Sequence, residues 1–299
     1  MNLSVVVPTL NAREELADCL DALAEYAPDA EVIVVNGPSA DGTTGMVQDR
    51  SDVDVLVEIA DRTINAARNA GIDRSTGDYV AFVNHTLAVT EDWPAALDRG
   101  LAGNAVVTGP TRSQIAGNAL EEPEERAIAG RTVAYFNPGN VAFDREPLDK
   151  LDGFDEYLSV GGARDFAHRL AGSDYSVCWD DRMAVREEVG SDGGEPSTDW
   201  NWKYRSLAYR LVKNYGLRPT VVRRVLAHAG SDAYHHLKAV VTGEEPPSQW
   251  LGTGRDVVTG ILGGVWTGLG ARRRDRTARR NPSGRSSRAD RAVTVYDWR

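Results

Sequence analysis

Several residue types and motifs are scarce or missing in this chain of 299 residues. Its two cysteines, Cys19 and Cys178, have no CxxC or Cys/His partner nearby, so we expect both to be small buried apolar residues. The five histidines do not form the H-x-x-E or H-x-H spacings that are typical of zinc sites. The sequence also has no G-x-S-x-G elbow and no P-loop. These absences argue against a zinc enzyme, a serine hydrolase of the elbow type and a P-loop protein.

A secretory leader and a long apolar run are missing as well. The chain opens as a strand, Leu3–Val7, without a basic n-region or an apolar h-region, so we expect a cytoplasmic location. Residues 257–271 are uncharged but glycine-rich, and this segment is shorter than the roughly twenty apolar residues that span a bilayer. Arg272, Arg273 and Arg274 follow at once. A short apolar run beside basic residues suits a helix lying in the membrane interface; the alternative is a helix that packs on the domain.

Lysine is nearly absent. The basic residues are 4 Lys and 30 Arg, and the acidic residues are 27 Asp and 17 Glu. An Asp-rich, Lys-poor surface is typical of proteins kept soluble at very high salt, although a GC-rich genome would produce the same bias. Residues 251–299 have a net charge of +7 and residues 1–250 a net charge of −17. An acidic body argues against nucleic-acid binding by the main domain. The basic end is compatible with contact to anionic lipid or with a disordered Arg-rich tail.

Strand-like and helix-like segments alternate over the first 110 residues. The strands are apolar on successive residues, as is typical of parallel strands covered by helices on both faces. We therefore predict an α/β sandwich of the nucleotide-binding kind with a mostly parallel central sheet, followed by C-terminal amphipathic helices. The expected strands are Leu3–Val7, Glu31–Val35, Val53–Glu58, Asp78–Val83 and Ala105–Gly109, and the expected helices are Glu14–Ala27, Gly42–Arg50, Thr63–Ile72, Trp93–Leu101 and Trp200–Tyr215.

Polar residues gather where the predicted strands end. Pro8-Thr9-Leu10-Asn11 follows the first strand, residues 36–43 (NGPSADGT) follow the second, and Arg68-Asn69-Ala70-Gly71 comes further on. In this order the segments resemble the N-terminal half of the family 2, GT-A-fold glycosyltransferases, which bind a nucleotide-sugar at the carboxyl edge of the sheet. The likeness extends over about residues 1–190 and implies a GT-A-like sandwich.

The resemblance divides the chain into regions. The expected regions are a glycosyltransferase domain over residues 1–190, with a nucleotide-sugar half (1–110) and an acceptor half (111–190), then an aromatic and basic helical region (191–250), and a short apolar helix with an Arg-rich tail (251–299).

The resemblance also assigns a donor site. Short polar segments at strand ends offer N–H groups and acceptors to a base, and the helix N-termini that follow favour a pyrophosphate. Arg68 would neutralise the diphosphate. The alternative interpretation is that the polar residues of these loops only cap helices and that Arg68 is a solvated arginine on a helix face. The residues implied for the nucleotide-sugar are Pro8, Thr9, Asn11, Glu14, Asn36, Ser39, Asp41, Arg68 and Asn84.

The sequence departs from the family where acids are expected. Asn84-His85-Thr86 stands in place of the family's Asp-x-Asp motif, whose carboxylates hold a divalent ion. Mg²⁺ and Mn²⁺ prefer carboxylate oxygens, so a metal held by Asn84, His85 and Thr86 is doubtful. Asn36 also replaces an acid. The alternative is a site in which Arg68 or His85 balances the leaving diphosphate.

Arg164-Asp165 stands where the family has Glu-Asp, one member of which deprotonates the acceptor hydroxyl in an inverting displacement. Asp165 is therefore our candidate base, and the alternative is an acid that interacts with the helix dipole. Arg164 should lower the pKa of that carboxyl. Asn140 and Asp155 lie in segments that resemble the family's acceptor side.

Taken together, the residues and the resemblance predict an enzyme that moves a hexose or hexuronic acid from a nucleotide-diphosphate-sugar to a lipid-linked glycan. The family resemblance implies a dolichyl or polyprenyl phosphate-linked acceptor at the inner face of the membrane, as in the haloarchaeal-type assembly of N-glycans for surface-layer proteins. A degenerate, non-catalytic member that binds nucleotide-sugar or scaffolds a glycosylation complex is the first alternative. The second, a nucleotidyltransferase, should carry a glycine-rich loop after the first strand, which Pro8–Asn11 is not.

Overall fold

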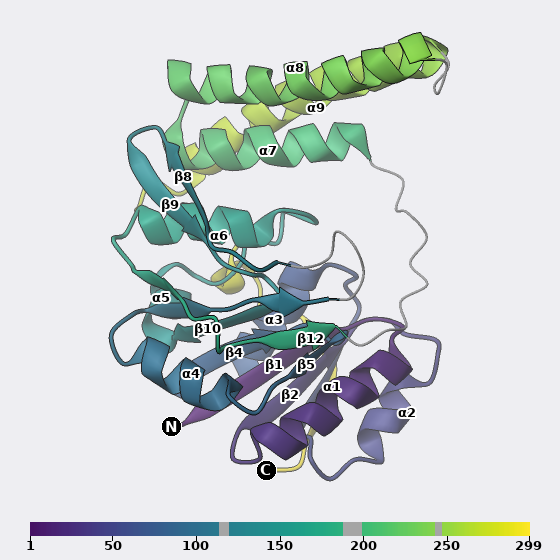
Figure 1. The fold of residues 1–299 in the computed structure, drawn as a ribbon, viewed down its shortest axis with the longest axis vertical. Coiled ribbons are helices and arrows are strands. Elements are labelled where there is room, and N and C mark those ends of the chain that lie inside the picture. Colours follow the sequence, from purple (N-terminus) through teal and green to yellow (C-terminus); the bar gives the residue numbers. More distant parts are fainter. Residues whose placement is uncertain (114–119, 188–198, 243–246) are drawn as a thin grey trace. The chain divides into compact units, whose positions relative to one another are not determined.

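The computed structural model of this chain describes residues 1–113, 120–187, 199–242 and 247–299, and its main feature is a sheet of eight strands (Figure 1). Neighbouring strands are parallel except where β10 and β13 join the sheet, so the prediction of a mostly parallel α/β sheet is confirmed. In spatial order the strands are β11 (Val177–Trp179), β6 (Val106–Thr108), β10 (Asn140–Asp144), β4 (Tyr79–Val83), β1 (Leu3–Thr9), β2 (Glu31–Asn36), β3 (Val55–Ile59) and β13 (Ala292–Asp297).

The remaining elements are helices and two small sheets. All strands and helices predicted in the first 110 residues are present, with ends that differ by no more than two residues, and the helix predicted at Trp200–Tyr215 is also present. The helices are α1 (Arg13–Tyr26), α2 (Thr43–Gln48), α3 (Ile64–Arg74), α4 (Trp93–Leu101), α5 (Arg145–Lys150), α6 (Gly162–Ala171), α7 (Trp200–Tyr215), α8 (Pro219–Thr242) and α9 (Pro247–Arg274), with a 3-10 turn at Arg285–Ser287. The small sheets pair β5 (Leu87–Val89) and β7 (Thr111–Arg112) with β12 (Val185–Glu187), and β8 (Glu124–Ile128) with β9 (Arg131–Tyr135).

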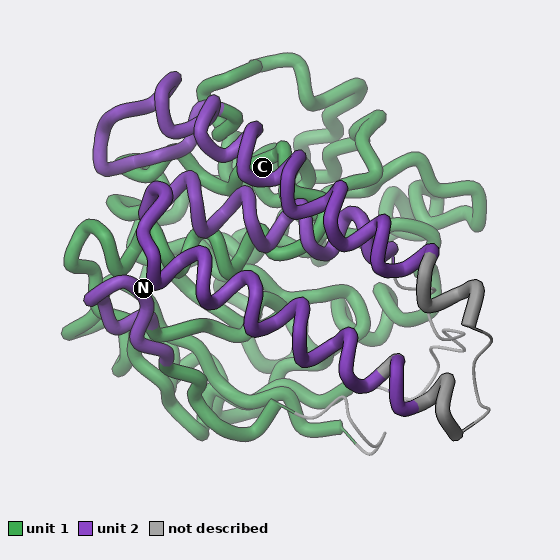
Figure 2. The backbone as a smooth tube through the Cα atoms, turned by 90° about the horizontal axis from the view of Figure 1, so that it is seen from above, with its two compact units in different colours: residues 1–125, 134–192, 283–299 green, residues 126–133, 193–282 purple. Residues whose placement is uncertain are grey.

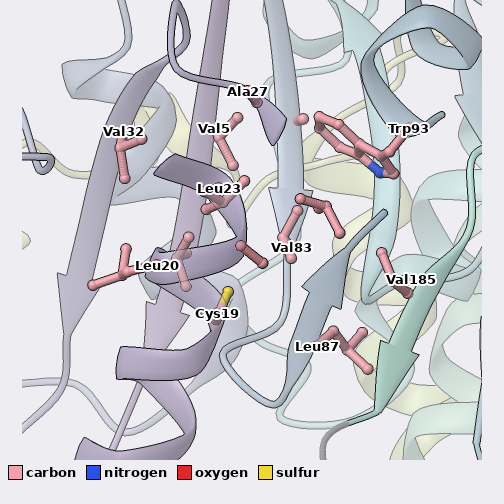
Figure 3. Packing of buried hydrophobic residues seen from close by; sticks show 14 of the residues in the cluster. Val5, Cys19, Leu20, Leu23, Ala27, Val32, Val83, Leu87, Trp93 and Val185 are labelled. Carbon is pink, nitrogen blue, oxygen red and sulfur yellow. The ribbon is translucent and has the colours of Figure 1, made fainter. Parts of the chain in front are cut away.

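The central strand β1 is buried on both faces, because successive side chains of a strand point to opposite sides. Val5 packs in a core with α1 and α4 that includes Leu20, Cys19 and Trp93 (Figure 3). Burial raises the pKa of the Cys19 thiol to about 12, so Cys19 behaves as the small apolar residue that the sequence predicted. Cys178 is only half-buried and packs at the edge of the same cluster.

The opposite face of the sheet is covered by α3 and by a cluster of phenylalanines. A Cβ on Gly71 of α3 would lie 2.3 Å from Cγ1 of Val6, so this helix lies close against β1. Phe82, which pairs with Val6 across the sheet, packs edge-on against Phe154. The ring of Phe154 stacks in turn on Phe166, with 5.1 Å between their centroids, and so joins α6 to this face. Aromatic pairs of this kind add to the stabilisation that comes from buried area alone.

Two compact units, coloured separately in Figure 2, are formed from interleaved parts of the chain. Unit 1 contains Met1–Glu125, Ala134–Asp192 and Ser283–Arg299, and unit 2 contains Arg126–Val133 and Gly193–Pro282. The three consecutive regions expected from the sequence differ from this arrangement, because the chain returns to unit 1 at Ser283. The predicted boundary at residue 190 and the join at residues 191–197 lie outside the described residues.

The last seventeen residues are folded, so of the two alternatives left open for the basic end, a disordered Arg-rich tail does not hold for this part of the chain. β13 pairs antiparallel with β3 and covers an edge that would otherwise expose unpaired N–H and C=O groups. The Arg291 side chain is buried, and its Nε lies 2.5 Å from Oε1 of Glu156. None of the helices in the described residues is long and apolar enough to cross a membrane.

The contact between α3 and β1 gives a stability prediction. Gly71→Ala should destabilise unit 1 by about 1–3 kcal/mol, because overpacking against Val6 outweighs the gain in helix propensity. Gly45→Ala in α2 is the matched control, since a Cβ there meets nothing within 4 Å. Denaturant unfolding of both variants in molar KCl would measure the difference. Equal stability of the two variants would contradict the close contact.

Candidate functional site

Four parallel strands end at one edge of the sheet, and a hollow of about 140 Å³ lies there. The carboxyl edge of a parallel sheet is where α/β proteins bind ligands. A cavity of about 150 Å³ holds a benzene ring, so the hollow has about the volume needed for one six-membered ring. We call it the strand-end pocket. Its lining residues are Pro8, Thr9, Leu10, Gly37, Ile59, Asp61, Arg62, Thr63, Ile64, Ala67, Asn84 and His85.

Two of the residues that line the strand-end pocket, Thr9 and His85, carry polar groups. Thr9 is buried, and its hydroxyl has no hydrogen-bond partner in the described part of the chain. His85 Nδ1 lies 3.0 Å from the carbonyl oxygen of Pro8. A carbonyl only accepts hydrogen bonds, so Nδ1 carries the proton, and in the neutral ring Nε2 is then an acceptor. An unsatisfied buried hydroxyl is costly unless a ligand or water pairs with it.

The predicted residues of the loops after β1 and β2 are brought together, and they bond to one another. The Asn11 N–H donates to Ser39 Oγ over 2.8 Å, and the Ala40 N–H donates to Asn11 Oδ1 over 2.8 Å. Ser39 Oγ donates in turn to Asn36 Oδ1 over 2.7 Å. Asn11 has φ +50°, a left-handed conformation that asparagine tolerates better than most residues. These bonds fix the two loops beside the pocket that Pro8 and Thr9 line.

Asp41 and Glu14 lie near these loops but do not line the pocket. Asp41 accepts hydrogen bonds from the N–H groups of Arg13 and Thr43, over 3.0 and 3.1 Å, at the starts of α1 and α2. Burial pushes the pKa of Asp41 upward, but hydrogen bonds from Thr43 and Arg13 outweigh it and hold this pKa below its ordinary value. Glu14 is exposed in the first turn of α1. This geometry matches the helix-cap alternative for Asp41.

Arg68 is a buried cation on α3. Its Nη2 donates to the carbonyl oxygen of Pro138 over 2.6 Å, and its guanidinium carbon lies 5.0 Å from the ring centroid of Phe154. In the described part of the chain it has no ion pair, and its Nε has no hydrogen-bond partner. Burial lowers the pKa of Arg68 to about 10. Arg68 does not line the pocket, so its role toward a diphosphate stays a prediction.

The residues that replace the Asp-x-Asp motif do not fit a typical divalent-metal site. Asn84 and His85 line the pocket, whereas Thr86 does not. Among the described residues, no group of three or more His, Cys, Asp and Glu side chains is placed to hold a metal ion. The carboxylate that does line the pocket, Asp61, is paired with Arg288 at 2.8 Å. An amide and one imidazole lack the carboxylate oxygens that Mg²⁺ and Mn²⁺ favour.

Asp165 lies on α6 in an environment that the sequence did not predict. Its carboxylate accepts a hydrogen bond from Arg169 Nε at 2.9 Å, and both side chains are fully buried. Arg169 also donates to the carbonyl oxygens of Leu151 and Gly153, over 2.7 and 2.8 Å. Arg164, the expected partner of Asp165, instead pairs with Glu124 at 2.8 Å, and Asp165 does not line the strand-end pocket.

The two residues predicted for the acceptor side are buried and bonded within the protein. Asn140 accepts a hydrogen bond from Trp93 Nε1 over 2.8 Å and donates through Nδ2 to the carbonyl oxygen of Met183 over 2.5 Å. Asp155 accepts from the Tyr157 N–H over 3.1 Å. Both side chains are 0% exposed, so in this structure they hold neighbouring segments of unit 1 in place.

Two parts of the site were not predicted from the sequence: the residues after β3 and the arginines near the C-terminus. Asp61, Arg62 and Thr63 follow β3 and line the pocket, and the rule that selected the ends of β1 and β2 would have found them. Arg288 reaches Asp61 and also pairs with Glu156 at 2.9 Å. No local pattern in the sequence marks Arg288, because its partners lie 132 and 227 residues away.

The chain is similar to known glycosyltransferases. The family model described as "Glycosyl transferase family 2" matches residues 4–151. The chain is 26% identical over 252 residues to glycosyltransferase AglE of Haloferax volcanii, which covers 76% of this chain and 78% of that protein. It is 35% identical over 91 residues to the amylovoran biosynthesis glycosyltransferase AmsB of Erwinia amylovora, which covers 28% of this chain and 30% of that protein.

Two solved structures have the same fold. The mannosyltransferase PcManGT from Pyrobaculum calidifontis, in complex with GDP-Man and Mn²⁺, matches with a TM-score of 0.56 and 18% identity over 89% of this chain and 87% of that one. S. aureus TarS 1-349, in complex with UDP-GlcNAc, matches with a TM-score of 0.61 and 17% identity over 87% of this chain and 82% of that one. At these identities the likeness concerns the fold, and the predicted GT-A-like fold is confirmed.

The pairing of Arg288 with Asp61 leads to a binding prediction. Arg288→Gln should weaken the binding of nucleoside diphosphates about two- to fivefold, because Asp61 loses the partner that fixes it at the pocket. Arg285→Gln is the matched control, since Arg285 pairs with Asp73 and Asp149, which do not line the pocket. Titration calorimetry would compare the two variants. An equal loss in both would assign the effect to general stability.

Proposed function

Residues 4–151 make this chain a member of glycosyl transferase family 2, and from that premise we propose that it transfers a sugar to a lipid-linked glycan. It is a glycosyltransferase that uses a nucleotide-sugar donor. The observation that carries the proposal is the strand-end pocket, a hollow of about 140 Å³ that Thr9, Asn84 and His85 help to line where four parallel strands end. We assign the base to this pocket, and a hexose or hexuronic acid to the donor.

The proposed acceptor is a glycan on dolichyl or polyprenyl phosphate. The aromatic and basic helix α7 motivated this proposal, but the structure buries its Tyr204 and Tyr209. What supports the proposal is the exposed end of α7, where Lys203 lies 4.4 Å from the ring centroid of Trp200, because aromatic and basic residues together suit the membrane interface. We further propose that the enzyme acts at the inner face of the membrane, in the assembly of N-glycans for surface-layer proteins, and that its Asp-rich, Lys-poor composition reflects life at high salt.

The proposed reaction is an inverting displacement. The acceptor oxygen attacks the anomeric carbon, the bond to the nucleoside diphosphate breaks, and a base removes the acceptor's proton. We keep Asp165 as the proposed base. Because Asp165 is enclosed with Arg169, its carboxylate has to become accessible at the start of α6 before it can take this proton.

The proposed charge balance at the leaving diphosphate depends on this chain's cations. PcManGT is bound to Mn²⁺, but Asn84 and His85 do not fit a carboxylate metal site here. We therefore propose that Arg68 and the imidazolium form of His85, in which Nε2 carries a proton while Nδ1 donates to the Pro8 carbonyl, stabilise the negative charge that develops on the leaving group. Turnover of the donor should then persist in EDTA, and His85→Ala should lower it about 10²- to 10³-fold. A rate that falls to background in EDTA and returns with Mn²⁺ would contradict this assignment.

A donor screen tests the proposed function directly. Nucleotide-sugars would be screened by thermal shift in molar KCl, and those that bind would be offered together with dolichyl phosphate-linked glycans. Release of nucleoside diphosphate with lengthening of the lipid-linked glycan is the expected result. Saturable binding without turnover of any donor would instead identify a non-catalytic member of the family.

Substitution of Asp165 separates a catalytic role from a structural one. Asp165→Asn should lower turnover by about 10²- to 10⁴-fold, because the amide cannot take a proton. Arg169→Lys is the control, since it disturbs the same buried pair and removes donors to Leu151 and Gly153, yet keeps the carboxylate. Turnover and unfolding would be measured for both. Losses of turnover that follow the losses of stability in both variants would remove Asp165 from the chemistry.

A further inference from the structure

Charge is divided unequally between the two units. Unit 2 carries 17 Lys and Arg against 7 Asp and Glu, a net charge of +10, whereas unit 1 carries 17 against 37, a net charge of −20. A basic surface attracts anionic partners, and an acidic surface repels them. Unit 2 is therefore the part of the molecule suited to an anionic surface.

Glycines fix the orientation of α9 within unit 2, where it packs along α7 (Figure 1). A Cβ on Gly260, Gly264 or Gly268 would lie 2.3, 2.3 or 2.8 Å from a backbone oxygen of α7. These positions are four residues apart, so they form one stripe along the helix. Because only glycine fits this contact, the stripe determines which face of α9 is turned toward α7.

The opposite face of α9 is apolar and exposed. Val258, Leu262 and Trp266 are 56%, 65% and 78% exposed. They also lie four residues apart, and each is offset by two residues from a glycine of the packed stripe, which places them about 200° around the helix. We call these three residues the α9 apolar face. A row of large apolar side chains held in solvent in this way marks a surface that binds something.

Basic residues accompany this apolar face. Arg255 precedes it by one turn and is exposed, next to Asp256, and Arg273 and Arg274 follow it and are also exposed. Arg272 is different, because it donates to the carbonyl oxygens of Lys213 and Asn214 within unit 2. Tryptophan with flanking arginine is the combination that membrane interfaces favour.

Helix α8 carries a second apolar row of the same kind. Val222, Leu226 and Tyr234 are 44%, 59% and 67% exposed, at spacings of four and eight residues. Arg223 is exposed beside Val222. The exposed apolar surface of unit 2 is thus present on both of its long helices, together with positive charge.

We infer that the α9 apolar face, with support from α8, docks on an anionic lipid surface. This docking rests on the proposed function, since a lipid-linked acceptor is met at a membrane. The positive charge of unit 2 favours anionic lipid as the partner. A second copy of unit 2 carries the same positive charge and would be repelled. The Debye length is about 10 Å at 0.1 M salt and about 3 Å at 1 M. Arginine attraction should therefore act at low salt, whereas the apolar contact persists at high salt.

Vesicle flotation of the full chain tests the inference, with phosphatidylglycerol–phosphatidylcholine vesicles compared with pure phosphatidylcholine. At about 0.1 M KCl the protein should float with the anionic vesicles, and at about 1 M KCl part of this binding should remain. Trp266→Ser should lower the bound fraction about tenfold at both salt concentrations, because the Trp ring no longer enters the interface. Arg273→Gln combined with Arg274→Gln should lower it only at the lower salt concentration.

The matched control is Trp298→Ser, which removes another exposed tryptophan, in unit 1. It should float like the unchanged protein. Failure of the unchanged protein to float, or an equal loss in the two tryptophan variants, would overturn the inference. A molar mass in light scattering that halves in Trp266→Ser without vesicles would show instead that this face joins two copies.

Donor binding measured without vesicles separates this inference from the proposed function. Trp266→Ser should bind nucleotide-sugar as the unchanged protein does. Normal flotation without any sugar transfer would leave the docking face in place and refute the proposed reaction.

Discussion

The parallel pairing of β1 with β2 and β4 is the constraint on which the site depends. It sets Thr9 beside Asn36 in register and lets the strand ends of β1, β2, β3 and β4 open at one edge of the sheet. Parallel strands need helices on both faces, and the contact of Gly71 with Val6 shows how closely α3 covers one of them. The loops at this edge are therefore held by the sheet.

The sequence was sufficient for the parts of the fold that depend on neighbouring residues. Apolar runs and glycine junctions predicted the first strands and helices, and polar residues after strand ends predicted that Thr9, Asn36 and Asn84 lie near one edge. Contacts between distant segments could not be predicted in this way. The pair Asp165–Arg169 needed the burial of α6, and Arg288–Asp61 needed the return of the chain through β13. A single sequence carries no local signal for either pair.

The loss of acids near the pocket agrees with the charges of the residues around it. Asn36, Asn84 and Thr86 remove carboxylates from the neighbourhood of the pocket, and Arg288 neutralises the carboxylate of Asp61 that remains. Arg68 is buried on α3 without an ion pair among the described residues, so its charge is uncompensated. In a low-dielectric interior such a charge acts over a longer distance than in water. A surrounding of this kind favours an anionic ligand although unit 1 as a whole is strongly acidic.

The negative charge of unit 1 opposes binding to an anionic membrane. Unit 1, with a net charge of −20, is repelled by anionic lipid at low salt, and salt weakens that repulsion. Salt weakens the attraction of unit 2 in equal measure, so charge alone cannot hold the molecule to a membrane at high ionic strength. Apolar contact is not screened in this way, because the gain from burying apolar surface does not depend on charge. If the protein works at molar salt, the exposed Leu262 and Trp266 are therefore needed for docking, and the arginines mainly select anionic lipid.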